Sequence, residues 1–463
     1  MDITTAPPHS SSKLDTVVIG GGISGLAIAY ALGKKGKKVH VLEKTDRLGG
    51  AVQTINKDGY LCEAGPNSFL VKSQEVWDFV HELGLEDSMV MANEMSNKRF
   101  LVKNGRMIAL PSSMMGGVTT PLYSIGEKFR LLAEPFIGRS KMDDESLTSF
   151  VSRRMGPAFL EYGISALASG IYAGNPDKLS VRHAFGKVWN LEQKYGSLIV
   201  GAVRLMRERK KLGIKPFKSR MISFKTGLVE LTTALSNEKI MTISTGTDIQ
   251  SITRNDDDSW TVDAGSEGSS SSLHAAELVL ATPLDAYADL PFAADVKQQM
   301  AEIEIPNHPP LSTLVLGFDR SQIAHPLDGF GALFPRMEKR FGLGAIFSTT
   351  LFPGRAPEGK VSLMCFIGGI MQQENGTMPT EQMIREMTED LRPLLGITGD
   401  PEFHSHSFWP RAIPQYDVGH QYFLDSLEKV EKAFPGLHLR GNFRGGPGLN
   451  DCLQSGMDFA RED

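Results

Sequence analysis

The chain has 463 residues and a formal net charge of -5, with 41% hydrophobic and 22% charged residues. This length predicts two or three domains around a large buried core, and the charge argues against a general nucleic-acid-binding protein. Only Cys62, Cys365 and Cys452 occur, without the spacing of a disulfide framework or a zinc site. We therefore predict a reducing compartment and no metal centre.

The first 13 residues are polar and rich in Pro and Ser, and they lack the basic and apolar regions of a secretion signal. We expect a disordered tail over residues 1–13. No window approaches 18 consecutive apolar residues, so no spanning helix is predicted. We expect a cytoplasmic protein. Membrane contact, which stays open, would be peripheral and on the inner face of the cell membrane.

A β-branched run, Thr16 to Ile19, leads directly into glycines, as a buried parallel strand does before a tight turn. Gly20, Gly22 and Gly25 fit the G-x-G-x-x-G pattern, and a helix is expected from Ser24 to Lys35. The glycines would let backbone approach a pyrophosphate, and the helix N-terminus would stabilise its negative charge.

A second strand is predicted at Val39 to Leu42, immediately before Glu43. Glu43 lies 18 positions after Gly25, where a carboxylate can accept both hydroxyls of an adenosine ribose. Because strand, glycines, helix, strand and acid follow in this order, the stretch predicts a dinucleotide-binding βαβ unit.

The continuation Arg47-Leu48-Gly49-Gly50 favours FAD over NAD. FAD extends over more of a protein, so a second glycine pair would let backbone pass near the pyrophosphate while Arg47 offers a cation. An ordinary polar turn is the alternative interpretation of these residues.

Two later segments are candidate binding elements. The segment Gly65 to Phe69, GPNSF, predicts a tight loop with small polar groups, although many such loops bind nothing. A hairpin is expected from Arg99 to Pro111 with its turn at Asn104-Gly105. Arg99 is either a solvated strand end or a partner for a substrate carboxylate.

From Ser112 to about Lys218 the composition favours helices, with a capped helix start expected over Asp143 to Phe150. Gly163 to Asp177 is rich in small residues, which let backbone approach a flat ligand or let helices pack closely. The basic stretch Leu205 to Lys225 follows apolar residues. It could contact anionic lipid headgroups or be an ordinary solvated face.

After a predicted amphipathic helix ending near Leu235, Ile240 to Ile252 is expected to form one strand. Trp260 to Ala264 and Glu277 to Ala281 predict two more, separated by the polar run Gly265 to Ser272. Residues 291–424 are expected to be rich in strands, the clearest being Ser312–Phe318, Leu343–Phe347 and Val361–Phe366.

The C-terminal region repeats the pattern of the N-terminal one. A strand predicted at Leu437 to Asn442 is followed by Gly445 to Gly456, which enters a helix near Asn450. Two glycine-rich junctions at opposite ends of the chain fit one domain built around one long cofactor, with the middle segments inserted. The second helix N-terminus could face the edge of a flavin that gains negative charge on reduction.

The predicted fold class is therefore α/β. We expect a Rossmann-like FAD-binding domain over 14–95, 222–290 and 425–463, with an inserted mixed α+β substrate-binding sheet domain at 291–424. A helical domain over 96–221 would contact substrate or membrane.

Several of these segments resemble those of the oxygen-dependent, FAD-containing protoporphyrinogen oxidases of the flavin amine oxidase superfamily. The similarity covers nearly the whole chain after the tail. It is carried by GGGISG at 20–25, RLGG at 47–50, GPNSF at 65–69, RFLVKNGRMIALPS from Arg99, GIYAGNPDKLSVRHAF at 170–185, FSTTLFPGRAP at 347–357, WPRAIPQYDVGH at 409–420 and GNFRGGPGLNDCLQSG at 441–456.

The resemblance implies which residues hold the cofactor and the substrate. For FAD they are Gly20, Gly21, Gly22, Ile23, Ser24, Gly25, Glu43, Lys44, Arg47, Gly49, Gly50, Gly65, Pro66, Asn67, Ser68, Asp248, Gly441, Asn442, Pro447, Gly448 and Leu449. For a tetrapyrrole they are Arg99 on a propionate, the Gly170 backbone, and Ile346, Leu363 and Phe366 around the rings, although the last three equally suit core packing. Ala51 departs from the family pattern, which commonly has arginine there.

The implied reaction is oxidation of protoporphyrinogen IX to protoporphyrin IX in haem biosynthesis, by three successive hydride transfers to FAD with molecular oxygen as acceptor. No catalytic acid or base is assigned, because the aromatic product drives the reaction. The alternatives are coproporphyrinogen III oxidation, another amine oxidase or desaturase, and a non-enzymatic FAD-binding protein. The expected partners are the tetrapyrrole and oxygen but no nucleic acid, and a homodimer stays open.

Overall fold

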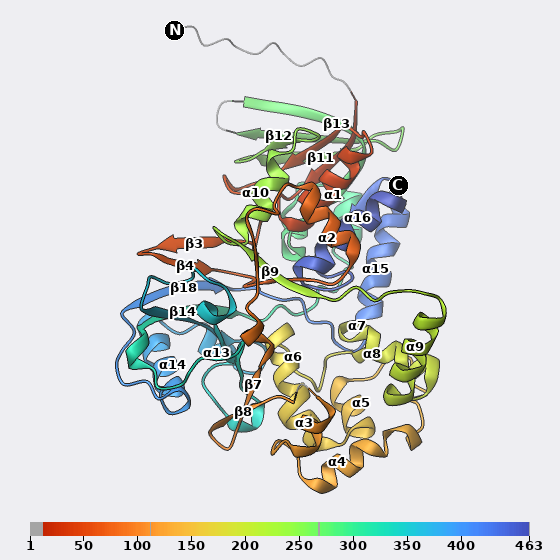
Figure 1. Ribbon diagram of the computed structural model, residues 1–463. Helices are drawn as coiled ribbons and strands as arrows, with labels where there is room; N and C mark the ends of the chain where they lie inside the picture. Colours follow the sequence, from red (N-terminus) through yellow and green to blue (C-terminus); the bar gives the residue numbers. More distant parts are fainter. Residues whose placement is uncertain (1–12, 112, 267–268, 463) are drawn as a thin grey trace. The chain divides into compact units, whose positions relative to one another are not determined.

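The computed structural model describes residues 13–111, 113–266 and 269–462, so the predicted tail lies outside the described residues except for Lys13. The chain divides into two compact units, whose helices and strands are labelled in Figure 1. The first unit comprises the described parts of Met1–Val52, Val229–Ile305 and Tyr422–Asp463. The second comprises the described parts of Gln53–Leu228 and Pro306–Gln421.

The described part of the first unit contains a seven-stranded sheet in the order β10-β2-β1-β13-β12-β11, with β19 also paired to β13. Its strands are β1 (Leu14–Ile19), β2 (Val39–Leu42), β10 (Thr242–Ser244), β11 (Asp248–Arg254), β12 (Trp260–Ser266), β13 (Ser269–Leu280) and β19 (Leu437–Leu439). Strands β10, β2, β1, β13 and β19 run parallel, whereas β11, β12 and β13 pair antiparallel. The strand–helix–strand prediction at the N-terminus is thereby confirmed.

The helices of this unit are α1 (Ile23–Lys34), α10 (Val229–Asn237), α11 (Ala294–Met300), most of α15 (His420–Ala433) and α16 (Leu449–Glu462). Helices α1 and α16 pack closely because Gly456 has no side chain: a Cβ there would lie 2.8 Å from the Cβ of Ala27. The two predicted glycine-rich junctions therefore belong to one compact unit.

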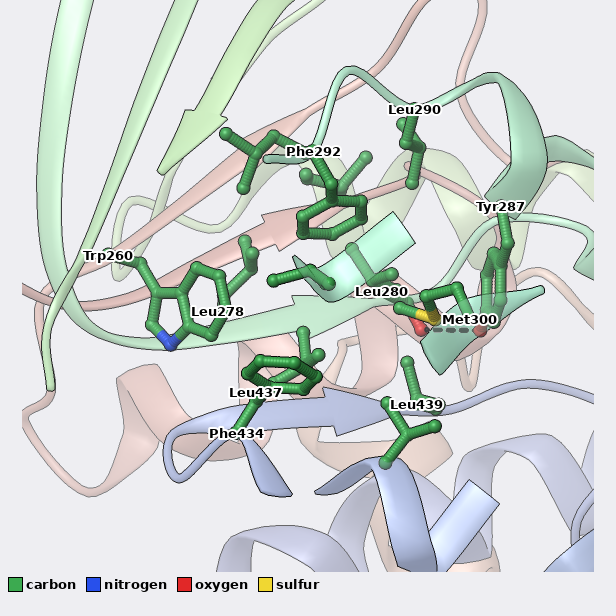
Figure 2. Close-up of a cluster of buried hydrophobic side chains, with 14 of the residues drawn as sticks. Trp260, Leu278, Leu280, Tyr287, Leu290, Phe292, Met300, Phe434, Leu437 and Leu439 are labelled. Carbon is green, nitrogen blue, oxygen red and sulfur yellow. Dashed lines mark hydrogen bonds between the residues drawn. The ribbon is translucent and has the colours of Figure 1, made fainter. Parts of the chain in front are cut away.

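One face of the sheet is covered by the apolar cluster shown in Figure 2. Trp260 is fully buried and its ring lies 6.2 Å, centroid to centroid, from that of Phe292 in an edge-on arrangement. Tyr287 donates a hydrogen bond of 3.3 Å to the carbonyl oxygen of Leu280. Leu278 and Leu437, from paired strands, pack in the same cluster, so the C-terminal strand is fixed to the sheet through its core.

The main sheet of the second unit has the order β18-β14-β17-β16-β15-β7-β8. Its strands are β7 (Phe100–Lys103), β8 (Arg106–Ala109), β14 (Leu311–Asp319), β15 (Gly331–Leu333), β16 (Gly344–Phe347), β17 (Lys360–Gly368) and β18 (Phe403–Trp409). Smaller sheets pair β3 (Thr54–Lys57) with β4 (Tyr60–Glu63), and β9 (Arg220–Phe224) with β5 (Phe69–Val71) and β6 (Met89–Met91).

Helix α14 (Thr380–Leu395) packs against one face of the main sheet through Met383, Met387 and Leu391. This helix was not predicted from the sequence, although its apolar residues recur every four positions. The other helices at the sheets are α2 (Gln74–Glu82), α12 (Ser348–Leu351) and α13 (Gln373–Gly376).

The helices predicted between residues 112 and 218 are present as a group in Figure 1. They are α3 (Met114–Thr119), α4 (Ile125–Leu132), α5 (Leu147–Arg154), α6 (Ser165–Tyr172), α7 (Val181–Ala184), α8 (Gly186–Tyr195) and α9 (Leu198–Lys211), with a π-helix at Phe159–Ile164 and a short 3-10 helix at Glu134–Phe136. The buried Arg154 side chain pairs with Glu134 at 2.9 Å and with Glu192. Glu134 also accepts the N–H of Leu198, so one carboxylate caps α9 and balances a buried cation.

One boundary prediction was wrong. Ile240–Ile252 is not one strand: β10 and β11 are separated by a turn at Gly246, where the N–H of Thr247 donates to the carbonyl oxygen of Glu43. The capped helix start predicted over Asp143 to Phe150 is confirmed, because α5 begins at Leu147 and its N-cap, Ser146, accepts the N–H of Ser149.

Candidate functional site

The first glycine-rich junction connects β1 to α1 and is too crowded for a side chain at Gly20 and at Gly25. Gly20 has φ +109°, and a Cβ there would lie 2.7 Å from the carbonyl oxygen of Ala281 on the neighbouring strand. A Cβ on Gly25 would lie 2.0 Å from the carbonyl oxygen of Gly20. Gly22 is the N-cap of α1, and no side chain caps that helix. Its first N–H groups therefore lack a side-chain acceptor at the cap, an arrangement that suits an anion.

The glycine pair after the ribose acid lies beside the first glycines. The N–H of Gly49 donates to the carbonyl oxygen of Gly21 at 2.8 Å, and the Cα of Gly50 would be the nearest atom, at 3.9 Å, to a Cβ on Gly22. The Arg47 guanidinium donates to the carbonyl oxygens of Leu48 and Gly50. Arg47 thus stabilises the turn itself, and its predicted contact with a phosphate stays a prediction.

Glu43 follows β2 and its carboxylate is held in place by local donors. Oε2 accepts the N–H of Gly21 at 2.8 Å, and Oε1 accepts both the N–H and the hydroxyl of Thr45. The carboxylate of the predicted ribose acid is thereby fixed against the glycine turn. Lys44 is exposed beside it, and Asp248, the exposed first residue of β11, follows Thr247.

The second junction connects β19 to α16 in the same unit. Gly445 and Gly446 both have positive φ, at +78° and +131°, and a Cβ on Gly446 would lie 2.8 Å from a carboxylate oxygen of Asp451. A Cβ on Gly441 would lie 2.5 Å from the ring of Phe443. Pro447, Gly448 and the first helical residue, Leu449, lead into α16. Both junctions thus offer backbone where other residues would place side chains, which fits a long dinucleotide.

The predicted loop Gly65 to Ser68 belongs to the second unit and follows β4. Its base is fixed because the carbonyl oxygen of Ala64 accepts two hydrogen bonds of 2.8 Å, from the Thr313 hydroxyl and from the Trp409 indole. Asn67 Oδ1 is buried and has no hydrogen-bond partner in the described part of the chain. An unpaired buried acceptor is costly, so this oxygen suits the N–H group of a bound ring.

Asn67 lines a small cavity of about 20 Å³ together with Glu63, Arg355 and Cys62. Glu63 and Arg355 form a buried ion pair with an N–O distance of 3.4 Å. Burial raises the pKa of Glu63 and lowers the pKa of Arg355. Burial also raises the pKa of the Cys62 thiol to about 12, which disfavours the nucleophilic thiolate form. This ion pair was not predicted from the sequence, although Arg355 lies in the FPGRAP segment.

Arg99 precedes β7 and is exposed. Its guanidinium carbon lies 5.1 Å from the centroid of the Phe330 ring, and no described carboxylate lies within salt-bridge distance of it. Phe330 packs, with Ile346 and Phe366, in one apolar cluster on the sheet face opposite α14. The structure therefore brings together three of the predicted substrate residues, Arg99, Ile346 and Phe366, around a ring that the sequence analysis missed.

Leu363 is separated from this group. It is fully buried and packs in the cluster that covers α14, together with Cys365 and Met387. Side chains alternate along a strand, so Leu363 and Phe366 point to opposite faces of β17. The residue that shares the face of Ile346 is its cross-strand partner Met364. Alternation within the sequence LMCF could have revealed this difference.

Gly170 lies in α6 and faces β15. A Cβ there would lie 2.7 Å from the side chain of Leu333, so the helix backbone approaches the same sheet face that carries Arg99. Among the described residues no group of three His, Cys, Asp or Glu side chains could hold a metal ion. The helices in the described ranges are all too short or too polar to cross a membrane.

The amino-acid sequence also matches a known protein family. Residues 23–462 match the family described as flavin containing amine oxidoreductase. The chain belongs to this family. As a member of this family it is an FAD-dependent oxidase, and the two glycine-rich junctions fit that cofactor.

Individual proteins of known name are also similar to this chain over most of its length. The mitochondrial protoporphyrinogen oxidase of Nicotiana tabacum is 31% identical over 98% of this chain and 95% of its own length. The coproporphyrinogen III oxidase of Bacillus subtilis is 29% identical over 96% of this chain and 97% of its own length. A crystal structure from Exiguobacterium sp. 255-15, assigned as a protoporphyrinogen oxidase, has a TM-score of 0.79 at 25% identity and covers 98% of this chain and 99% of that one.

Proposed function

We propose that this flavin oxidase converts protoporphyrinogen IX to protoporphyrin IX with molecular oxygen, in haem biosynthesis. The main support for the proposal is the surroundings of Arg99 on the sheet face opposite α14. An exposed guanidinium without a carboxylate partner lies beside Phe330, in an apolar cluster with Ile346 and Phe366. A flat apolar ring system with acidic side chains is the ligand class that such a face complements. The similarity to the tobacco enzyme supports the same substrate class.

FAD-binding residues are proposed for each unit considered by itself. In the first unit they are Gly20, Gly21, Gly22, Ile23, Ser24, Gly25, Glu43, Lys44, Arg47, Gly49, Gly50, Asp248, Gly441, Asn442, Pro447, Gly448 and Leu449. In the second unit they are Gly65, Pro66, Asn67 and Ser68. When bound, FAD supplies the two-electron acceptor for the oxidation and is reoxidised by oxygen. The glycines admit the pyrophosphate, and the fixed Glu43 carboxylate accepts the ribose hydroxyls.

The substrate residues position a macrocycle and exclude water from it. Arg99 pairs with a propionate, the Gly170 backbone borders the ring, and Ile346 and Phe366 contact the pyrroles. Met364, which shares their face, takes the place first given to Leu363. No acid or base is required, because the macrocycle gains aromaticity as it loses its electrons and protons. The buried Cys62 thiol and the Glu63–Arg355 pair have structural roles in this account.

We also propose a peripheral contact between the helices of the second unit and the inner face of the cell membrane. Four large apolar side chains on α4 and the following 3-10 helix are highly exposed and recur at helical spacing: Ile125 at 74%, Phe129 at 67%, Leu132 at 65% and Phe136 at 90%. Helix α9 adds three basic residues in its last turn. Apolar and basic groups together suit an anionic lipid surface. Sedimentation with vesicles checks this proposal, and a vesicle-independent homodimer is the alternative outcome.

Steady-state turnover under air tests the proposed reaction. Protoporphyrinogen IX, coproporphyrinogen III and putrescine are offered separately, and porphyrin fluorescence and hydrogen peroxide are followed. We expect porphyrin and peroxide with protoporphyrinogen and no peroxide with the amine. Faster turnover of coproporphyrinogen would favour the activity named for the Bacillus subtilis relative, and peroxide only with the amine would contradict the proposal.

A further inference from the structure

The buried ion pair between Glu63 and Arg355 lies at the end of β4, and the Gly65–Ser68 loop begins two residues later. Each of the two side chains is only 4% exposed. The Glu63 carboxylate also accepts the Thr54 hydroxyl at 2.7 Å and the N–H of Leu228 at 2.9 Å. These hydrogen bonds and the Arg355 charge oppose the rise that burial causes in the pKa of Glu63.

Arg355 joins this position to three strands of the second unit. Its guanidinium donates to the Ser223 hydroxyl in β9. Its carbonyl oxygen accepts the N–H of Leu61 in β4 at 3.3 Å and the hydroxyl of Ser362 in β17 at 3.4 Å. Replacing a buried ion pair by apolar side chains is often neutral or stabilising, so stability alone does not account for a pair at this position.

The pair shares its small cavity with residues of both proposed binding sites. Asn67, from the proposed flavin loop, and Ile346 and Met364, from the proposed substrate site, line the cavity of about 20 Å³ together with Glu63 and Arg355. A cavity of this size holds about one water molecule. Little water therefore screens the two charges from a group that contacts Asn67, and charges act strongly in such surroundings.

We infer that the Glu63–Arg355 pair, beyond its structural role, sets the reduction potential of the flavin that contacts the Gly65–Ser68 loop. This inference rests on the proposed function, in which that loop contacts FAD, but not on which porphyrinogen is oxidised. Reduction adds negative charge to the flavin ring, which a nearby cation stabilises and a nearby carboxylate destabilises. In the intact pair the two effects oppose each other. Such a balance suits an oxidase, whose flavin must accept electrons from a substrate and also pass them to oxygen.

Redox titration of the purified, FAD-loaded protein tests the inference. Glu63→Gln leaves the Arg355 cation without its carboxylate and should raise the midpoint potential by about 30 mV, which is about tenfold in the equilibrium constant for two-electron reduction. Arg355→Gln leaves the carboxylate and should lower the potential by a similar amount at about pH 9, where an unpaired buried carboxyl group is ionised. The double variant Glu63→Gln/Arg355→Gln should return the potential toward the wild-type value.

Asp390→Asn is the matched control. It breaks a second partly buried ion pair of the same unit, between Arg340 and Asp390 with an N–O distance of 2.9 Å. Asp390 lies on α14, which packs against the other face of the main sheet, so the midpoint potential should not change. Thermal melting and flavin absorbance report the folding and FAD content of every variant. If Glu63→Gln retains no FAD, Arg355→Gln and the double variant still test the inference.

Opposite shifts in the two single variants, reversed in the double variant, are the expected result. A purely structural role would lower the melting temperature or FAD content without opposite shifts in potential. Shifts of one sign in both single variants, no shift in Arg355→Gln, no reversal in the double variant, or an equal shift in Asp390→Asn would overturn the inference. None of these measurements uses a porphyrinogen, so failure of the protein to oxidise one would refute the proposed function separately.

Discussion

The two glycine-rich junctions of the first unit differ in construction from the proposed substrate face of the second unit. That substrate face is the sheet face that carries Arg99, Ile346, Met364 and Phe366. The junctions are made of backbone: Gly20, Gly25 and Gly446 are positions where a Cβ would collide with neighbouring atoms. The substrate face is made of side chains whose use depends on which side of a strand they occupy. A site made of backbone tolerates almost no substitution, whereas a site made of side chains can change its ligand through single residues.

The largest effect is expected at the crowded junction. Gly25→Val places atoms on top of the Gly20 carbonyl oxygen, which a Cβ would approach to 2.0 Å, so the turn cannot form and FAD is lost. The measurement is the flavin absorbance of the purified variant. Gly186→Ala is the matched control, because a Cβ there meets nothing within 4 Å. A yellow Gly25→Val protein with normal FAD content would show that this turn does not hold the cofactor.

The next effect separates the two faces of β17. Leu363→Ala should lower the free energy of unfolding by about 2–5 kcal/mol, the usual cost of such a core truncation, with little change in KM. Met364→Ala should instead raise the KM for protoporphyrinogen, because its side chain lies on the face of Ile346. Denaturant unfolding and steady-state kinetics on both variants check the assignment. A raised KM for Leu363→Ala alone would reverse it.

Arg99→Ala removes an exposed cation that lies beside Phe330 and its apolar cluster. Loss of a charged hydrogen bond is expected to raise the activation free energy for protoporphyrinogen by about 2 kcal/mol, which lowers kcat/KM roughly thirtyfold. Lys98→Ala, on the opposite face, is the control and should leave kcat/KM unchanged. Equal kcat/KM values for Arg99→Ala and wild type would show that the substrate does not bind at this face.

The smallest effect concerns pH. His40 in β2 lies 2.9 Å from the Ser244 hydroxyl, and burial lowers its pKa below the ordinary value of 6.5. The unfolded chain therefore binds the proton more readily, so the stability from His40 is complete above pH 6.5 and declines as the pH falls. Replacing His40 with Gln should flatten the stability profile below pH 6.5. A profile that keeps the wild-type slope would assign the acid sensitivity to other groups.

Local features were the ones that could be predicted from the sequence. The Asn104–Gly105 turn has both residues at positive φ, at 53° and 70°, and the C-terminal glycines enter α16, as their residue types indicate. Leu363 and Phe366 lie on opposite faces of β17, which strand alternation indicates, although the resemblance assigned both residues to the substrate. The ion pair between Arg336 and Glu161 joins residues 175 positions apart, so no local pattern indicated it. Helix α14 was missed because it lies among strands in the sequence.

The most direct test of the central claim is anaerobic mixing of the purified, FAD-loaded protein with protoporphyrinogen IX while flavin absorbance and porphyrin fluorescence are recorded. The account predicts that the flavin absorbance bleaches as porphyrin fluorescence appears, and that air restores the yellow colour. A folded protein that takes up no FAD, or whose flavin stays oxidised beside the porphyrinogen, would contradict it.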